Sequence, residues 1–295
     1  MTRQLASTSA APGSRPATGR LIVGCGYLGS RVARRWIEAG NRVWAMTRSP
    51  ARAAEFAAAG IEPIVADVTK PDTIRGLPDV ATVFWAVGFD RTGGATYREV
   101  HVDGLGRVID AAPGTARIIL SSSTGVWGND DGAVVNEASP ARPTREAGAV
   151  LLEAEAMLHS RAPGRGTALR FAGLYGPDRL PRLDDLRAGR PIAADPDSWL
   201  NLIHVDDAAH VVCTVADADV PRPLYVASDG RPVRRRDWYG HLADLIGSDP
   251  PRWDASAPRT RGADKRVDPA LLFRDLQVRF AHPDALVAIG RLLKE

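Results

Sequence analysis

Apolar runs alternate with amphipathic stretches along the first half of the chain. Residues 21–23 and 82–87 are almost wholly apolar, as expected for parallel strands that are buried on both faces. Residues 30–39 place apolar side chains at helical spacing, and residues 51–59 form an alanine-rich stretch closed by Gly60. Further strands are predicted at 42–46, 61–66 and 117–120, with a long helix at 95–112. The pattern predicts an α/β fold built on a doubly wound parallel sheet.

The second half of the chain has a weaker pattern. Helices are predicted at residues 143–158, 208–216 and 236–246, and a strand at 224–227. Residues 248–263 are rich in proline and polar side chains, which predicts a loop. Two short closing elements are expected at 271–273 and 286–293.

Composition and charge exclude several classes of protein. No stretch of the 295 residues approaches the ~20 uninterrupted apolar residues of a membrane-spanning helix. The net charge is +3, and the arginine-rich tract 231–236 fits a solvated turn and helix start better than a nucleic-acid site. Two cysteines form neither a disulfide framework nor a metal-ligand pattern, so a cytoplasmic protein is expected. Residues 1–19 contain no acid and no apolar segment, and they are interpreted as a disordered tail.

Three glycines follow the first predicted strand, at the spacing Gly24-x-Gly26-x-x-Gly29, and a predicted helix begins directly after them. In a dinucleotide-binding turn the first glycine permits the sharp bend and the second lets the backbone approach a pyrophosphate. The third lets the helix pack closely on the strand. The phosphate charge then lies at the helix N-terminus, where N–H groups and the helix dipole favour an anion. A glycine-rich turn also arises for packing reasons alone, but the strand and helix on its two sides favour a dinucleotide site.

The end of the second predicted strand bears on the choice of dinucleotide. Sites that prefer NAD place an acid about 20 residues after the first glycine, where it binds the ribose 2′-hydroxyl. No acid occurs between Asn41 and Arg52, and Arg48 stands at this position. A guanidinium can bind a 2′-phosphate with two hydrogen bonds, so we expect NADP, with NAD as the alternative. The competing interpretation is that Arg48 is an exposed loop arginine.

Four later segments, in this order after the glycine turn, carry a family resemblance. They are Ser-Ser-Ser-Thr-Gly-Val-Trp-Gly at 121–128, Val-Asn-Glu at 135–137, Leu-Arg-Phe-Ala-Gly-Leu-Tyr-Gly-Pro at 169–177 and Asn-Leu-Ile-His-Val-Asp-Asp-Ala at 201–208. Over residues 21–228 the chain resembles the extended short-chain dehydrogenase/reductase superfamily, in its NAD-dependent epimerase/dehydratase group.

The resemblance implies an NAD(P)-binding oxidoreductase-like or epimerase-like protein that acts on a small molecule and forms a homodimer through the helices near 95–112 and 143–160. It implies a Rossmann domain at 20–173, to which residues 201–228 return. Residues 174–200 and 229–295 are then expected to form a small α/β substrate lobe.

The resemblance also implies roles for particular residues. The cofactor positions are Gly24, Gly26, Tyr27, Leu28 and Gly29 at the pyrophosphate, Thr47 and Arg48 at the ribose, Asp67 and Val68 at the adenine, Ala86, Val87 and Gly88 along the cofactor, and Ser121 and Ser122 beside the nicotinamide. Ser123 matches the serine that polarises the carbonyl or hydroxyl of the substrate.

The catalytic pair of the superfamily is missing from this chain. Its members use Tyr-x-x-x-Lys, in which the tyrosine is the general acid/base and the lysine lowers its pKa. Aligning Glu155 with the glutamate after that lysine puts Ala147 and Leu151 at the two positions, and no Tyr-x-x-x-Lys occurs anywhere in the sequence. The chain therefore resembles an atypical branch, either an enzyme with another proton donor or a catalytically silent NADP-binding regulatory or scaffold protein.

Three residues are candidates for the missing proton donor, and each of them also has a purely structural explanation. Tyr175, with Arg179 four residues later, fits turn packing better than catalysis. Glu146 fits the first turn of a helix, where an acid complements the helix dipole. His101 fits a core position.

One further cluster, His204 with Asp206 and Asp207, looks at first like a set of metal ligands. In the family this segment caps a helix, so no metal is expected.

Overall fold

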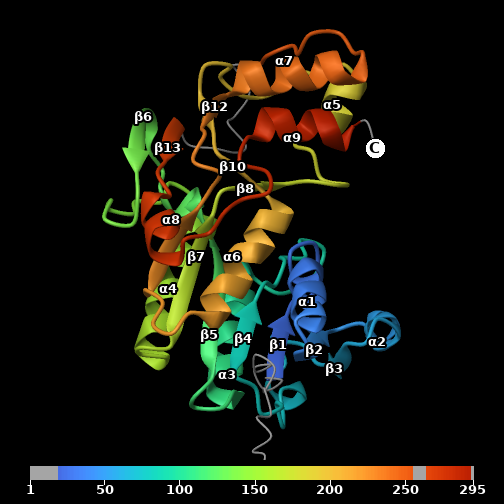
Figure 1. Ribbon diagram of the computed structural model, residues 1–295, viewed down its shortest axis with the longest axis vertical. Coiled ribbons are helices and arrows are strands. Elements are labelled where there is room, and N and C mark those ends of the chain that lie inside the picture. Colours follow the sequence, from blue (N-terminus) through green and yellow to red (C-terminus); the bar gives the residue numbers. More distant parts are fainter. Residues whose placement is uncertain (1–18, 255–263, 294–295) are drawn as a thin grey trace, which may run out of the picture.

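The computed structural model of the chain describes residues 19–254 and 264–293 (Figure 1). The tail expected at 1–19 lies outside the described residues except for Gly19, which opens the first strand and so does not belong to a tail. Part of the loop expected at 248–263 also lies outside them.

Seven parallel strands form the central sheet, in the order β11-β7-β5-β4-β1-β2-β3. Their bounds are β1 Gly19–Val23, β2 Arg42–Thr47, β3 Glu62–Val65, β4 Thr82–Trp85, β5 Arg117–Ser123, β7 Gly166–Phe171 and β11 Leu224–Ala227. The order reverses at β1, as in other doubly wound folds, and the predicted fold class is confirmed.

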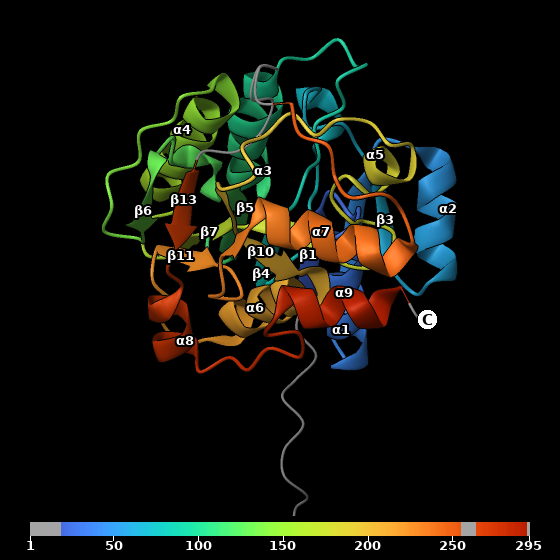
Figure 2. The same ribbon diagram turned by 90° about the horizontal axis from the view of Figure 1, so that it is seen from above.

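Alternate residues of each strand point to opposite faces of the sheet, and helices cover both faces (Figure 2). Ile22 and Phe84 pack with α1 (Gly29–Glu38) and α6 (Val205–Asp217) in one buried cluster. Their neighbours Leu21 and Val83 pack with α3 (Leu105–Ala111) and α4 (Glu146–Arg161) in another. Because both faces are buried, these strands read as nearly continuous apolar runs in the sequence.

The remaining helices are α2 Pro50–Ala58, α5 Leu183–Arg187, α7 Arg235–Ile246, α8 Ala270–Leu276 and α9 Ala285–Leu292, with short 3-10 turns η1 Pro71–Thr73 and η3 Thr124–Val126. The long helix predicted at 95–112 is present as a continuous helical stretch from Tyr97 to Ala111, but its first part, η2 (Glu99–Gly104), is π-helical and only then continues as α3. Within the described ranges no helix combines the length and the apolar character needed to cross a bilayer.

The C-terminal elements cluster beyond the carboxyl ends of the sheet strands, where α5, α7 and α9 lie together (Figures 1 and 2). Their buried core includes Trp238, Leu242 and Ile289. Three two-stranded sheets join this part to the main sheet: β8 Gly173–Tyr175 with β10 Leu202–His204, β9 Trp199–Leu200 with β12 Val233–Arg234, and β6 Asp130–Val135 with β13 Asp264–Val267. The division into a Rossmann domain and a substrate lobe stays a prediction.

Candidate functional site

A cavity of about 720 Å³ lies at the carboxyl ends of the strands on the β1 side of the sheet. Most of the residues predicted to bind a cofactor line it: Gly24, Gly26, Tyr27, Leu28, Thr47, Arg48, Asp67, Val68, Ala86, Val87, Gly88 and Ser121. Gly29 and Ser122 do not line this cavity. The residues predicted for one ligand thus surround one space.

The three glycines have different surroundings, which match their expected roles. Gly24 has a φ of +92°, and a Cβ there would lie 2.6 Å from the carbonyl oxygen of Ala86. At Gly29 a Cβ would lie 2.7 Å from the carbonyl oxygen of Gly24, so only glycine allows α1 to pack this closely on the turn. At Gly26 a Cβ would meet no protein atom within 4 Å, although Gly26 lines the cavity. The backbone at Gly26 therefore faces space that a bound group can fill, and α1 begins without a side-chain cap.

Two arginines flank the part of the cavity where the ribose is expected. Arg48 forms an ion pair with Asp90, with 3.2 Å between Nη2 and Oδ2. Arg52 donates from Nη2 to the carbonyl oxygen of Cys25, inside the glycine turn, at 3.0 Å. Hydrogen bonds from Thr92, followed by the bond from Arg48, hold the pKa of Asp90 at about 2, so Asp90 is ionised at neutral pH. At this end the cavity therefore carries the guanidinium groups of Arg48 and Arg52, with two carboxylates near Arg48, those of Asp90 and Asp67.

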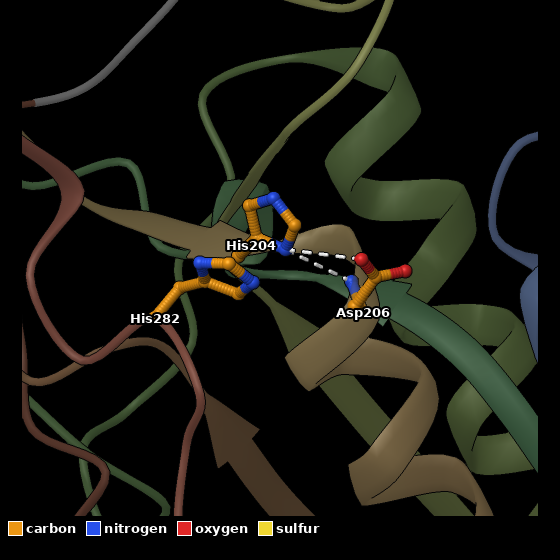
Figure 3. A group of neighbouring side chains, drawn as sticks. All are labelled: His204, Asp206 and His282. Carbon is orange, nitrogen blue, oxygen red and sulfur yellow. Dashed lines mark hydrogen bonds and ion pairs between the residues drawn. The ribbon is translucent and has the colours of Figure 1, made fainter. Parts of the chain in front are cut away.

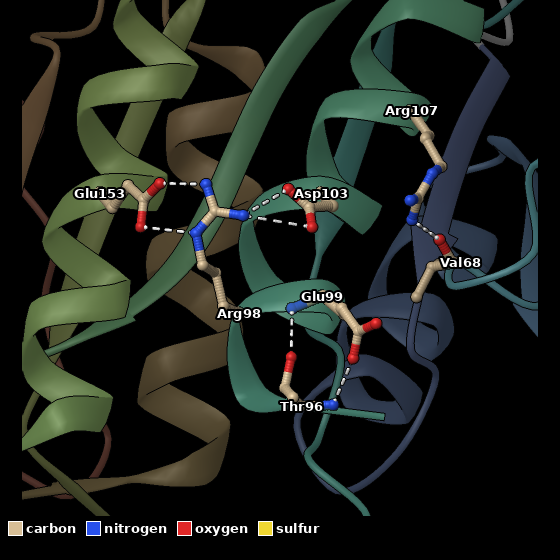
Figure 4. Close-up of polar contacts among 7 residues, drawn as sticks. All are labelled: Val68, Thr96, Arg98, Glu99, Asp103, Arg107 and Glu153. Carbon is tan, nitrogen blue, oxygen red and sulfur yellow. Dashed lines mark hydrogen bonds and ion pairs between the residues drawn. The ribbon is translucent and has the colours of Figure 1, made fainter. Parts of the chain in front are cut away.

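The loop after β3 is fixed from two sides (Figure 4). Arg107 of α3 donates to the carbonyl oxygen of Val68 at 2.9 Å. Burial alone would raise the pKa of Asp67, but hydrogen bonds from the hydroxyl and N–H of Thr69 outweigh it and lower the pKa. The segment that the sequence assigns to the adenine is thus held rigidly beside the cavity.

Hydrogen bonds and ion pairs also hold the start of the η2 segment in place (Figure 4). Thr96 and Glu99 exchange hydrogen bonds as a capping box: the N–H of Thr96 donates to Glu99 at 2.7 Å, and the N–H of Glu99 donates to Thr96 at 3.1 Å. Arg98 joins Asp103 to Glu153 of α4. These contacts hold η2, and with it α3, against α4 on the same face of the sheet.

A second cavity of about 700 Å³ adjoins the first and shares Ser121, Leu174 and Arg179 with it. Five basic side chains line it: Arg145, Arg179, Arg182, Arg235 and Lys265. Among the described residues no acidic side chain lines this cavity. Its electrostatic character suits an anion.

The three serines at the end of β5 differ in their contacts. Ser121 lines both cavities. Ser122 is buried, lines the second cavity and donates its hydroxyl to Glu155 at 2.5 Å. Ser123 lines the second cavity, and its Oγ accepts the N–H of Gly125 at 3.0 Å, which leaves the hydroxyl hydrogen able to donate.

The positions aligned with the missing catalytic pair contribute to neither cavity. Leu151 is buried against Val126 and Trp127, and Ala147 lies on the exposed side of α4. Glu155 accepts two hydrogen bonds from Arg170 in a buried ion pair below Ser122. This helix therefore supports the serine strand without supplying a group that can move a proton into the cavities.

Tyr175 and His101 are core residues. Tyr175 is fully buried, packs edge-on against His204 and Trp238, and lines neither cavity. Burial also raises its pKa, so the structure lends no support to Tyr175 as a catalytic group. His101 stacks on Tyr97 with ring centroids 4.2 Å apart, and burial lowers its pKa to about 4.

The cluster around His204 differs from the one expected (Figure 3). His204, Asp206 and His282 place their potential ligand atoms within 4.8 Å of one another. Nδ1 of His204, however, accepts the N–H of Asp206 at 3.2 Å, as the N-cap of α6, and Asp206 pairs with Arg31. The two imidazoles lie close together, with ring centroids 3.7 Å apart and ring planes tilted by 31°. The capping role expected for this segment holds for His204.

Asp207, the third residue of the expected cluster, makes different contacts. Its carboxylate accepts the N–H groups of Ala281 and His282 at 2.8 and 2.9 Å. Asp207 thus holds the C-terminal segment onto α6.

The sequence interpretation missed much of the second cavity. The tract 231–236 was expected to be solvated, yet Arg235 is buried, donates to Ser198 at 2.8 Å and lines the cavity. Lys265 comes from β13, a strand that the sequence did not predict. The one feature of the sequence that could have drawn attention to Lys265 is that lysine is rare in it: the chain has three lysines among 38 basic residues.

Comparison with known proteins agrees with this geometry. The model of the NAD dependent epimerase/dehydratase family matches residues 21–227. Protein YeeZ of Escherichia coli K12 is 29% identical over 279 residues, which cover 90% of this chain and 97% of YeeZ. UDP-glucose 4-epimerase of Streptomyces lividans is 25% identical over 246 residues, covering 77% and 69%. A solved structure from Methylobacillus flagellatus, named a candidate NAD-dependent epimerase/dehydratase, is 30% identical with a TM-score of 0.77, covering 94% and 98%.

Proposed function

Because the chain belongs to the NAD dependent epimerase/dehydratase family, we propose that it is an NAD(P)-dependent oxidoreductase or epimerase/dehydratase that acts on an anionic small molecule. The observation that carries the proposal is the junction of the two cavities. One is lined by the glycine turn, the other by basic side chains, and they meet at Ser121, Leu174 and Arg179. A dinucleotide in the first cavity would therefore have its reactive end beside a substrate in the second.

The residues present fit a dinucleotide. The open space at Gly26 admits a pyrophosphate, which the backbone from Gly24 to Leu28 and the uncapped end of α1 would hold. Thr47 and Arg48 would bind the ribose, and Asp67 and Val68 would border the adenine. When bound, the nicotinamide supplies the hydride acceptor or donor. Ser123 would orient the substrate by donating its hydroxyl hydrogen to a substrate oxygen.

We propose NADP as the preferred dinucleotide. Arg48 and Arg52 both line the cavity at its ribose end, and two guanidiniums suit a 2′-phosphate better than a free hydroxyl. A 2′-phosphate would compete with Asp90 for Arg48, because both are anions within reach of the same guanidinium.

The first experiment is a titration of the purified protein with NADPH and with NADH, followed by quenching of tryptophan fluorescence. Trp85 ends β4, the strand that leads into Ala86 and Val87 of the cavity wall. We expect tight binding of NADPH and weaker binding of NADH. If neither nucleotide binds, the glycine turn has only a structural role and the proposal fails.

The second experiment is a substrate screen with the nucleotide-loaded protein. Phosphorylated sugars and nucleotide sugars, including UDP-glucose, are incubated with the oxidised and reduced cofactor, and nicotinamide absorbance and product masses are followed. Neutral sugars serve as matched controls, since five basic side chains line the second cavity. Tight nucleotide binding without turnover of any anion would favour the alternative, a silent regulatory or scaffold protein.

We further propose that the protein works in the cytoplasm as a homodimer. Among the described residues both cysteines are free, which suits a reducing compartment. Light scattering of the purified protein tests the dimer: a monomer at micromolar concentration would contradict it.

A further inference from the structure

Lysine is rare in this chain, and Lys265 occupies an unusual place. Of the two lysines that the structure describes, Lys70 is exposed and Lys265 is 5% exposed. Lys265 lines the second cavity together with Ser123. The other four basic side chains there are arginines, which do not give up a proton near neutral pH. Lys265 is therefore the one basic group of this cavity that can exist as a neutral amine.

The backbone of Lys265 is rigidly held. β13 pairs in parallel with β6, and Lys265 lies opposite Ala133. The side-chain amide of Asn201 donates to the carbonyl oxygen of Lys265 and accepts the N–H of Val267, both at 2.8 Å. Asn201 thus acts as a strand partner on the open side of β13, and the lysine side chain starts from a fixed point.

The amino group of Lys265 reaches the turn that follows the serine strand. Nζ donates to the carbonyl oxygen of Trp127 at 2.9 Å, and Trp127 follows directly after the η3 turn that begins beyond Ser123. Among the described residues this carbonyl is its one hydrogen-bond acceptor. An ammonium has three N–H donors, so two remain for a ligand in the cavity that Lys265 lines.

The charges around Lys265 favour its neutral form. Burial comes first, and the guanidiniums of Arg235 on α7 and Arg145 before α4 add to it, while Asp264 on the same strand opposes them. Together they lower the pKa of Lys265 to about 8. A group with this pKa is present in both forms near neutral pH, as general acid–base catalysis requires.

We propose that Lys265 is the residue that exchanges a proton with the substrate, in place of the missing tyrosine. The proposal rests on the function proposed above. In the oxidising direction the neutral amine accepts the hydroxyl proton of the substrate and becomes an ammonium. The O–H electron pair forms the carbonyl as the carbon gives its hydride to oxidised NAD(P). In the reducing direction the ammonium returns the proton to the oxygen as the carbonyl carbon receives hydride.

The test measures the ionisation of Lys265 directly. Because the chain has only three lysines, protein grown with ¹³Cε-lysine gives three resolvable signals, which Lys70→Met and Lys265→Met assign. We expect the Lys265 signal to titrate at least one pH unit below the ordinary lysine value of about 10.4. Titration of Lys265 at the ordinary lysine value would overturn the proposal.

A chemical probe then tests whether the amine is neutral and open to the cavity. Pyridoxal 5′-phosphate carries an aldehyde, which condenses with a neutral amine and loses water, and a phosphate that the arginines can bind. After reduction with borohydride, mass spectrometry should find the label at Lys265 at least tenfold above Lys70 at pH 7.5. Pyridoxal without the phosphate is the control and should label Lys265 less. No label at Lys265 in folded protein would overturn the proposal.

Two variants separate this proposal from the proposed function. Lys265→Arg keeps the charge but removes the basicity, and Lys265→Met removes both. Both should bind NADPH as the unchanged protein does, because Lys265 does not line the cofactor cavity. On a substrate found in the screen, both should lower kcat about 10²-fold or more and remove the pH dependence near 8. Rescue of kcat by Lys265→Arg would overturn the proton-transfer role, whereas failure of the unchanged protein to bind nucleotide would overturn only the proposed function.

Discussion

The same substitution at two glycines of one turn, Gly26→Ala and Gly29→Ala, should have opposite consequences. At Gly26 the new methyl group meets no protein atom within 4 Å and enters the cavity, whereas at Gly29 it lies 2.7 Å from the carbonyl oxygen of Gly24. The backbone of neither residue lies in the left-handed region. Any difference between the variants therefore reports what surrounds each residue.

The magnitudes follow from these surroundings. Alanine at Gly26 restricts the unfolded chain, so stability should stay level or rise by about 0.4–1 kcal/mol. The methyl group keeps a pyrophosphate from the backbone; two lost charge-assisted hydrogen bonds, at about 1.5 kcal/mol each, weaken NADPH binding roughly 150-fold. Alanine at Gly29 overpacks the helix against the turn, which should cost about 1–3 kcal/mol of stability.

Two assays on each protein decide the matter. Urea unfolding gives the free energy of unfolding, and tryptophan quenching gives the dissociation constant for NADPH. We expect Gly26→Ala to lose binding while it keeps its stability, and Gly29→Ala to lose stability first. The reasoning is refuted if Gly26→Ala binds NADPH normally, or if it unfolds as early as Gly29→Ala does.

Three further predictions follow from the site and its supports. Arg48→Ala should weaken NADPH binding about tenfold and leave NADH binding unchanged. Arg42→Ala, at the opposite end of β2, is the control. An equal loss of affinity for both nucleotides would contradict the assignment of Arg48 to the 2′-phosphate. Glu155→Gln leaves the buried guanidinium of Arg170 without its charged partner and should cost about 3–5 kcal/mol in urea unfolding; a loss below ~1 kcal/mol would show that the pair is not buried in solution. Burial lowers the pKa of His101 to about 4, so between pH 6.5 and 4 the unfolded chain binds a proton that the folded protein does not, and the free energy of unfolding decreases as the pH falls. His101→Leu should make the free energy of unfolding depend less on pH in this range. An unchanged pH dependence would contradict this role of His101.

Local patterns in the sequence predicted well the part of the sheet that surrounds the first cavity. The apolar runs at β1 and β4 are buried on both faces, so their composition alone marks them as central strands. The glycine turn is a local motif in which two of the three glycines are required by close backbone atoms: Gly24 by Ala86 after β4, and Gly29 by Gly24 itself. Parallel strands then bring the strand ends together, which is why residues far apart in the sequence line one cavity.

The substrate side depends on long-range pairing, which the sequence does not show. β13 lies beside β6 although about 130 residues separate Lys265 from its partner Ala133. Neither strand has a strong alternating pattern, because each is short and only partly buried. The π-helical turn in η2 was missed for a related reason, since its apolar spacing differs from an α-helix by one residue over one turn. The partner of His204, His282, is likewise 78 positions away.

The two cavities are completed at different points along the chain. Among the described residues, those lining the first cavity end at Arg179, whereas the second cavity needs Lys265, which comes 86 positions later in the chain. A chain emerging from the ribosome has therefore presented every described residue of the first cavity well before Lys265 completes the second. Nucleotide bound at that stage would stabilise the half-finished sheet by mass action.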